Sequence, residues 1–207
     1  RSVSRGLGDV YKRQTNALIG RNAANNNSQT WMAMTMLDSN RAKSVISKKT
    51  NRSISEITNM IIWGNHSPTM YPDSENVLIS GQRGSDLIND MEWIESDFLP
   101  SVQQRGKAVI DARGASSATS AAKAAIDTVM ACETPTNHGD CFSAAIASDG
   151  AYNVPAGLIC GYPLITLEDG SIEIKRDLSL SEFASSKFQV SIDELISERE
   201  AVKHLMK

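Results

Sequence analysis

The sequence predicts an α+β domain in which long helices pack against an antiparallel sheet and a further helix closes the chain. Two patterns support this prediction. Apolar residues recur at helical spacing in several long segments, and one segment instead shows short β-like runs separated by tight turns. The 207 residues, 41% of them hydrophobic and 22% charged, can bury one sizeable core, with or without a small appendage.

The first third of the chain is expected to contain two helices and one buried strand. In order, the pattern predicts a short helix at 16–22, a polar loop at 25–28, a longer helix at about 38–49, a capping box at 53–56 and a strand at 60–63. The strand ends at a corner formed by Gly64, Asn65 and His66. Side chains at such a corner are held by the sheet and remain accessible.

The middle of the chain is expected to be helical. Apolar positions keep helical spacing from about 85 to 113, where Pro100 should bend or interrupt the helix, and a second helix should run over 118–130 after a cap at Ser116 or Ser117. Alanine-rich helix faces permit close packing. We expect this face to pack within the domain, with a subunit contact as the alternative.

The last third is expected to form the antiparallel sheet and the closing helix. Short β-like runs lie between 142 and 174, with turns at 148–150 and 168–170. Ser191 to Glu194 have the spacing of a capping box that would start an amphipathic helix. The apolar stripe of that helix would be Ile192, Leu195, Ile196, Val202, Leu205 and Met206.

Charge and composition exclude several classes of protein. The formal net charge is −3, and because the first 14 residues carry four basic and one acidic side chain, a net +3, residues 15–207 carry −6. Nothing in that part favours nucleic acid. Cys132, Cys141 and Cys160 form no metal or disulfide pattern, so we predict no metal site and a cytoplasmic location. The longest apolar stretch is too short to span a membrane.

Two short segments carry the candidate chemistry: Leu-Asp-Ser-Asn-Arg at 37–41 and Trp-Gly-Asn-His-Ser at 63–67. On a helix, Asp38 and Arg41 lie on one face about 5–6 Å apart at Cβ and are free to serve different partners. His66 is a titratable group suited to protonating a carbonyl oxygen near neutral pH. A small hydroxy or keto acid could be held and protonated there.

These segments resemble the malate dehydrogenases of the cytosolic type, which are NAD-dependent members of the lactate/malate dehydrogenase family. The resemblance also takes in residues 15–19, 42–43, 60–73, 103–106, 114–118, 148–150 and 154–155. It covers about nine tenths of the chain in the family's order, which chance matches of short motifs would not produce. It implies the lactate/malate dehydrogenase C-terminal fold, interconversion of malate and oxaloacetate with NAD, and a homodimer.

The resemblance also implies a role for each site residue. His66 matches the acid/base histidine, and Asp38 matches the carboxylate that orients its ring and favours the protonated form. Arg41 matches the arginine that grips the substrate carboxylate through two parallel hydrogen bonds. Ser117, with Ser116, matches a loop of hydroxyl groups near the substrate. Met36 and Met70 depart from the family pattern and are expected to affect packing or affinity before chemistry.

No dinucleotide-binding (Rossmann) domain is evident in the chain. Residues 6–11 hold two glycines of the G-x-G-x-x-G pattern, but Tyr11 occupies the third position and no strand precedes it. Residues 1–14 resemble a translated adapter sequence and are expected to be an extraneous, disordered leader, with a polyanion-binding arm as the alternative. Residues 15–207 would then form the substrate-binding and catalytic domain, inactive alone.

Two readings from other classes stay open. Ser117, His66 and Asp38 supply the residue types of a hydrolase triad, although no G-x-S-x-G elbow surrounds the serine. The other is a non-catalytic interaction module whose helices only form a dimer.

Overall fold

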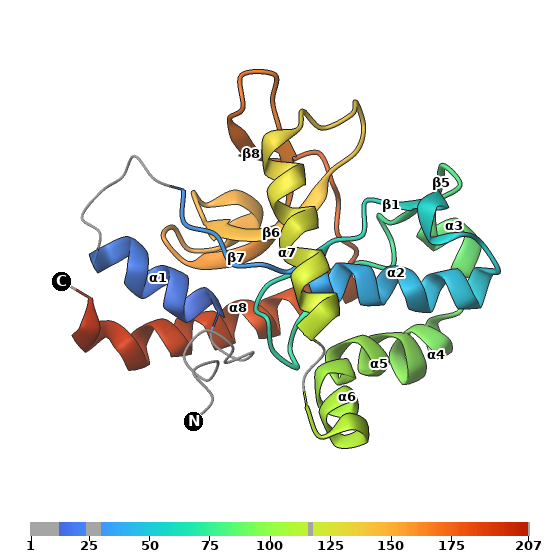
Figure 1. Ribbon diagram of the computed structural model, residues 1–207, viewed down its shortest axis with the longest axis horizontal. Coiled ribbons are helices and arrows are strands. Elements are labelled where there is room, and N and C mark those ends of the chain that lie inside the picture. The colour runs from blue at the N-terminus through green and yellow to red at the C-terminus, as the bar shows by residue number, and fades with distance from the viewer. Residues whose placement is uncertain (1–12, 24–29, 116–117, 207) are drawn as a thin grey trace.

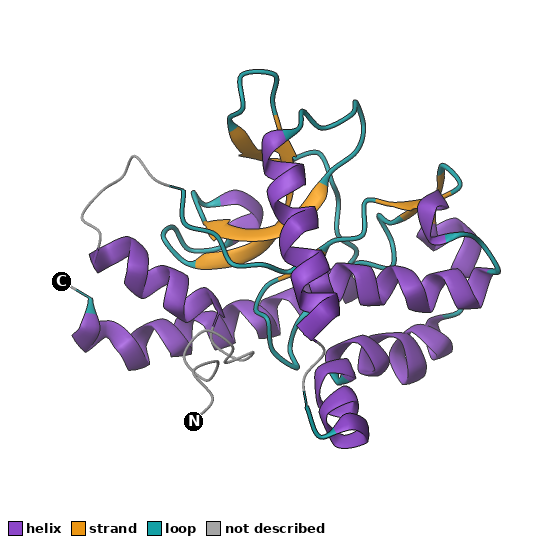
Figure 2. Cartoon of the chain, viewed as in Figure 1, coloured by secondary structure: helices purple, strands orange, loops and turns teal. Residues whose placement is uncertain are grey.

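The structure is a computed structural model that describes residues 13–23, 30–115 and 118–206. It confirms the predicted α+β architecture, in which small antiparallel sheets pack against helices (Figures 1 and 2). The helices are α1 (Arg13–Ala23), α2 (Met36–Thr50), α3 (Gly84–Ile88), α4 (Met91–Trp93), α5 (Leu99–Gln103), α6 (Arg105–Arg113), α7 (Ala118–Glu133) and α8 (Glu182–Val202). The strands are β1 (Ile57–Thr58), β2 (Ile62–Trp63), β3 (Tyr71–Pro72), β4 (Leu78–Ile79), β5 (Gln82–Arg83), β6 (Phe142–Ala147), β7 (Ile159–Thr166) and β8 (Ile172–Ile174).

The strands form small antiparallel sheets with the orders β1-β4-β5, β2-β3 and β6-β7-β8. Both predicted turns are present, since 148–150 lies between β6 and β7, and 168–170 closes the β7–β8 hairpin. An isolated bridge between Gly64 and Gly161 joins the end of β2 to β7. The corner after β2 is therefore attached to the largest sheet.

Helix α2 is fixed to these sheets through side chains at its start. Ser39 Oγ donates to the carbonyl of Met60 at 2.8 Å, and Thr35 Oγ1 lies 2.8 Å from Ser143 Oγ, which also accepts from the backbone N–H of Ile62. All of these groups are buried. A buried hydrogen bond is costly to leave unmade, so the position of α2 relative to β2 is well specified.

Trp63 lies at the centre of the core and is fully buried. Its ring contacts Tyr152 and Phe188, with centroids 4.7 and 5.1 Å away, and its indole N–H donates to Asp73 Oδ2 at 2.9 Å. The hydrogen bond satisfies the one polar atom of a large apolar side chain. The side chain of Trp63 thereby anchors in the core the strand that leads to the corner.

The segment 85–113 is not the long, bent helix that its apolar spacing predicts. It breaks at Asn89 and Asp90, continues as α4, a π-helical turn at Ile94–Phe98 and α5, and breaks again at Gln104. The π-helical turn lies just before Pro100. Proline lacks an N–H and its ring displaces the carbonyl four residues earlier, which accounts for the altered geometry of this turn. Helical backbone continues through Pro100, so Pro100 distorts the helix without interrupting it, and Asp90, which accepts from Trp93 N, caps α4.

The C-terminal helix is present, but its predicted start is wrong. Helix α8 begins at Glu182, where Ser181 is the N-cap, so Ser191 and Glu194 lie inside it and form no capping box. The apolar stripe is buried at Ile192 and Leu195, whereas Leu205 is exposed beyond the end of α8.

Helix α1 lies alongside α8 (Figure 1) and confirms the helix predicted at 16–22. Arg13 and Gln14, which were assigned to the leader, form its first turn. Residues 1–12 and the polar loop at 25–28 lie outside the described residues. Among the helices that the structure does describe, none combines the length and apolarity needed to cross a membrane. The three cysteines are free thiols, and the cytoplasmic location stays a prediction.

Candidate functional site

The candidate site begins at the corner between β2 and β3. Gly64 has φ +82°, and a Cβ added there would lie 2.1 Å from Ser191 Oγ. Only glycine combines this backbone conformation with so close an approach of α8. The turn brings Asn65, His66 and Ser67 into the interior, where each side chain is buried.

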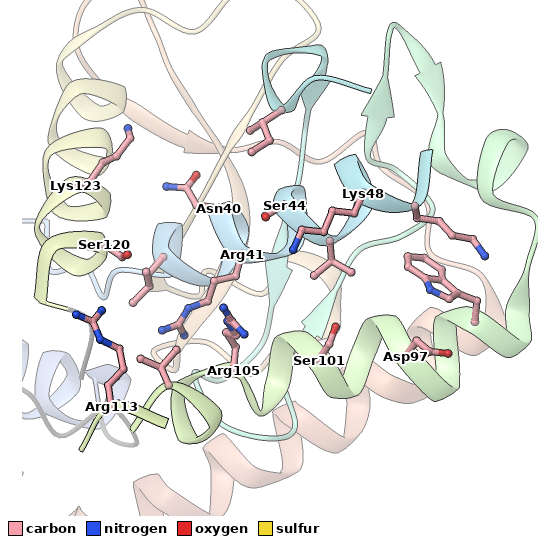
Figure 3. A pocket seen from close by; sticks show the side chains of 16 residues that line it. Asn40, Arg41, Ser44, Lys48, Asp97, Ser101, Arg105, Arg113, Ser120 and Lys123 are labelled. Atoms are coloured by element: carbon pink, nitrogen blue, oxygen red, sulfur yellow. The ribbon is translucent and has the colours of Figure 1, made fainter. Parts of the chain in front are cut away.

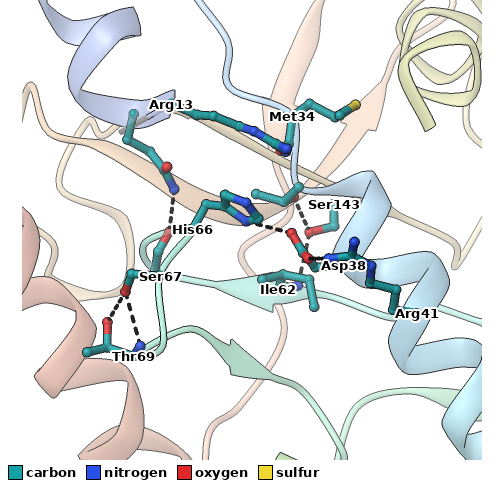
Figure 4. A network of polar contacts seen from close by, with 12 residues as sticks. Arg13, Met34, Asp38, Arg41, Ile62, His66, Ser67, Thr69 and Ser143 are labelled. Atoms are coloured by element: carbon teal, nitrogen blue, oxygen red, sulfur yellow. Dashed lines mark hydrogen bonds and ion pairs between the residues drawn. The ribbon is translucent and has the colours of Figure 1, made fainter. Parts of the chain in front are cut away.

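The structure brings His66 and Asp38 together as predicted. Nδ1 of His66 lies 2.6 Å from Oδ2 of Asp38, which comes from the first turn of α2 (Figure 4). His66 is 3% exposed and Asp38 0%. The opposite ring nitrogen, Nε2, has no partner among the residues that the structure describes. A carboxylate on one nitrogen therefore orients the ring, while Nε2 is buried without a hydrogen-bond partner in the described part of the chain.

Arg41 joins the same pair, and here one expectation is wrong. Nη1 of Arg41 donates to Oδ1 of Asp38 at 2.9 Å, so the two residues are partners instead of serving separate groups. Burial alone would raise the pKa of Asp38. The contact and charge of His66, with the positive charges of Arg41 and Arg13, outweigh burial and hold the pKa of Asp38 below its usual value. Asp38 is thus an ionised carboxylate shared by the guanidinium of Arg41 and the imidazole of His66.

Arg41 also lines a cavity of about 1050 Å³ between α2, α4 to α6 and α7 (Figure 3). Neither Asp38 nor His66 lines this cavity, so Arg41 is the residue at which the cavity and the buried pair meet. The cavity is strongly basic, because its ionisable lining comprises one acid, Asp97, and the six cations Arg41, Lys48, Lys49, Arg105, Arg113 and Lys123. Such a lining favours an anion.

Two residues outside the predicted site, Gln14 and Arg13, act on the corner and on Asp38 respectively. Gln14 Nε2 donates to the carbonyl of Gly64 at 3.1 Å, and Arg13 donates to the carbonyl of Met34 at 2.8 Å while its charge acts on Asp38. On α8, Ser191 and Glu194 bond residues on both sides of His66. The Ser-x-x-Glu spacing was the available signal for this pair, but it indicated a helix start.

Ser116 and Ser117 lie outside the described residues, so neither the substrate-loop assignment nor the hydrolase triad is tested by the structure. His138 and His204 are exposed. No group of three or more potential metal ligands gathers in the described parts of the chain.

Comparisons with known proteins identify the family to which the chain belongs. Residues 35–206 match the family model described as the lactate/malate dehydrogenase, alpha/beta C-terminal domain. The chain is 45% identical over 192 residues to the malate dehydrogenase of Cutibacterium acnes. This alignment covers 92% of this chain and 58% of that protein. The malate dehydrogenase of Magnetococcus marinus is also 45% identical, over 93% of this chain and 59% of the relative.

Solved structures share the fold. The crystal structure of malate dehydrogenase from Naegleria fowleri superposes with a TM-score of 0.85 at 39% identity, over 93% of this chain and 59% of that one. Lactate dehydrogenase of Trichomonas vaginalis, solved with NADH and oxamate, gives a TM-score of 0.79 at 24% identity, over 84% and 54%. The chain therefore belongs to the lactate/malate dehydrogenase family and contains that family's C-terminal domain. It spans a little under three fifths of the length of these curated relatives.

Proposed function

We propose that this chain is the substrate-binding and catalytic part of an NAD-dependent malate dehydrogenase, which interconverts malate and oxaloacetate. The observation that carries the proposal is the buried His66–Asp38 pair, 2.6 Å apart, with Nε2 of His66 unpartnered within the described residues. The relatives named malate dehydrogenase, at 45% identity, support the choice of substrate.

His66 is the proposed acid and base. When the ketone of oxaloacetate is reduced, negative charge develops on its oxygen, and protonated His66 donates the Nε2 proton to that oxygen. In the opposite direction, neutral His66 accepts the proton of the malate hydroxyl at Nε2. Ionised Asp38 stabilises the imidazolium in both directions and keeps the second nitrogen protonated.

Arg41 is the proposed carboxylate-binding residue. One of its nitrogens is held by Asp38 at 2.9 Å, which fixes the guanidinium plane at the edge of the basic cavity. The guanidinium presents five N–H donors in a fork, so it retains donors for a substrate carboxylate. Asp38 would thus orient both the proton donor and the anion-binding group.

NADH would supply the hydride when oxaloacetate is reduced, and NAD⁺ would accept it when malate is oxidised. The described residues do not offer a place to hold this dinucleotide. Every strand pair in them is antiparallel, whereas the dinucleotide fold needs parallel strands and a glycine-rich turn that opens a helix. The residues of this chain therefore supply the proton transfer and the carboxylate binding.

The test joins residues 15–207 to the preceding part of the Cutibacterium acnes malate dehydrogenase. This chimaeric protein should oxidise NADH only when oxaloacetate is added, and the 207-residue chain alone should not. His66→Asn in the chimaera should lower kcat by about 10²- to 10⁴-fold, because it removes the general acid. Unchanged turnover in His66→Asn would remove the assignment of the proton donor.

We also propose that the protein is a homodimer, as the family resemblance implies. Helix α7 supports this, because Ile126, Val129 and Met130 are 61%, 62% and 61% exposed on it. Large apolar side chains gathered on one exposed helix favour contact with another protein surface.

A further inference from the structure

Glu194, on α8, holds both residues that flank His66 in the chain. Its Oε2 accepts from Asn65 Nδ2 at 3.1 Å, from the hydroxyl of Ser67, and from the hydroxyl of Thr69 at 2.5 Å. Three donors of one corner thus converge on one oxygen of one carboxylate, although Asn65 and Glu194 are 129 positions apart. An ionised carboxylate only accepts hydrogen bonds, and such charge-assisted bonds are stronger than neutral ones.

Helix α8 also grips the backbone of the corner. Ser191, one helical turn before Glu194, accepts the N–H of Asn65 at its Oγ, at 2.7 Å. Residues three apart share a helix face, so Ser191 and Glu194 reach the corner together. Glu198, the next acid on that face, accepts from Asn65 Nδ2 at 2.9 Å and from Thr15 Oγ1 at 2.5 Å. Asn65 is therefore bonded to α8 by its backbone and by its side chain.

The two halves of the His66–Asp38 pair are fixed by separate anchors. Asp38 lies on α2, which Ser39 fixes to the carbonyl of Met60. His66 lies on the corner, which α8 fixes through Glu194 and Ser191. A 2.6 Å contact between groups on different elements depends on both anchors, because a shift of about 1 Å at either one removes the hydrogen-bond geometry.

We propose that Glu194 is a positioning residue for His66. By bonding Asn65 and Ser67, it holds the imidazole against Asp38 and keeps Nε2 directed to the substrate. This inference rests on the proposed acid/base role of His66. It assigns the C-terminal helix a task in catalysis that does not involve contact with substrate.

Proton NMR of the 207-residue chain tests the placement without any activity. The Nδ1–H proton of an imidazole bonded to a carboxylate resonates far downfield, and loss of the signal in His66→Asn assigns it. Glu194→Ala should reduce this signal to less than half, because the corner is released and the proton exchanges with solvent. Asp193→Ala is the matched control: it removes the neighbouring, exposed carboxylate of the same helix and should leave the signal unchanged.

A milder variant keeps the test decisive if Glu194→Ala does not fold. Ser67→Ala removes one of the three donors and should weaken the signal while the rest of the spectrum stays dispersed. The inference is overturned if a folded Glu194→Ala, or Ser67→Ala where Glu194→Ala is unfolded, gives the wild-type signal. It is also overturned if the wild-type chain gives no such signal.

Kinetics of the chimaeric protein separate this inference from the proposed function. There Glu194→Ala should lower kcat by up to about 100-fold with KM within about threefold, because a displaced catalytic group costs rate before binding. Absence of oxaloacetate reduction in the unsubstituted chimaera counts against the proposed function alone, and the NMR result still decides the role of Glu194. Full activity in Glu194→Ala counts against the positioning role alone.

Discussion

Asp38 should make the stability of the chain depend on pH in one direction. Its folded pKa lies below the unfolded value of about 3.9, so its contribution is fully present above that value and is lost as the pH falls through the folded pKa. Asp73 acts in the opposite direction, because burial raises its pKa. The comparison must therefore be made between variants that differ only at Asp38.

We predict that Asp38→Asn lowers the free energy of unfolding at pH 7 by up to about 3 kcal/mol, because the guanidinium of Arg41 loses its counter-ion and the buried ring of His66 loses its carboxylate partner. The difference from the wild-type chain should shrink as the pH is lowered from about 5 towards 3. Urea unfolding of both proteins at several pH values measures it. A difference that stays constant across this range would contradict the assignment of Asp38 as the shared anion.

Arg41 gives a second prediction for a single residue. In the chimaeric protein, Arg41→Lys should raise the KM for oxaloacetate about 10- to 100-fold, because an ammonium group cannot make two parallel bonds to a carboxylate while also bonding Asp38. Lys48→Ala is the control, since Lys48 lines the same cavity from the same helix. Equal KM values for the two variants would show that the fork of Arg41 is not what binds the substrate.

The sequence predicts these residues better than it predicts their bonds. Asp38, Arg41 and His66 could be named because their types and local spacing suit the chemistry, and the structure brings them together. The bond between Asp38 and Arg41, and the grip of Glu194 on the corner, could not be predicted. Both depend on side-chain directions, and the latter depends on contacts between segments that are distant in the chain.

The corner between β2 and β3 is the element that positions His66, and Gly64 sets its shape. We predict that Gly64→Ala lowers the free energy of unfolding by about 2–4 kcal/mol. The backbone at position 64 has a positive φ, and an added Cβ would meet Ser191 Oγ at 2.1 Å. Gly157→Ala is a matched control, with φ +85° and no heavy atom within 4 Å of the added Cβ. It should cost only about 1 kcal/mol.

Urea unfolding of the two glycine variants measures this difference. Equal losses of stability would mean that the close approach of α8 to the corner has little energetic consequence. A larger loss in Gly64→Ala, together with a weaker downfield signal from His66, would tie the stability of the corner to the placement of the imidazole.

The elements themselves were predictable where one local signal dominated. The β7–β8 hairpin follows from Glu-Asp-Gly at 168–170, and α2 lies close to the helix predicted at about 38–49. The breaks in the segment 85–113 were not predictable, because helical spacing of apolar residues survives a break when each short helix buries the same side. Asn89 and Gln104 adopt non-helical angles there, and the spacing of the apolar residues alone does not register such breaks.

For the whole molecule, the surface of α7 was the least predictable feature. The alanine-rich face packs within the domain as expected, with Ala124 fully buried and Ala121 and Ala131 packed against the core, but the opposite face of α7 is uncovered. The apolar side chains Ile126, Val129 and Met130 remain exposed. A sequence pattern indicates that a helix has an apolar face, but it does not say whether this chain or another one covers it.

We predict that this face carries the self-association of the protein. Sedimentation of the 207-residue chain at increasing concentration should show a reversible shift from monomer to dimer, and Val129→Glu should abolish it, because a charge buried in a protein contact without a partner is costly.

Val190→Glu is the matched control: Val190 is 56% exposed, against 62% for Val129, but lies on α8. It should leave the shift unchanged. Equal dimerisation of the two variants would place the contact elsewhere, and a wild-type chain that stays monomeric at every concentration would contradict self-association of this domain.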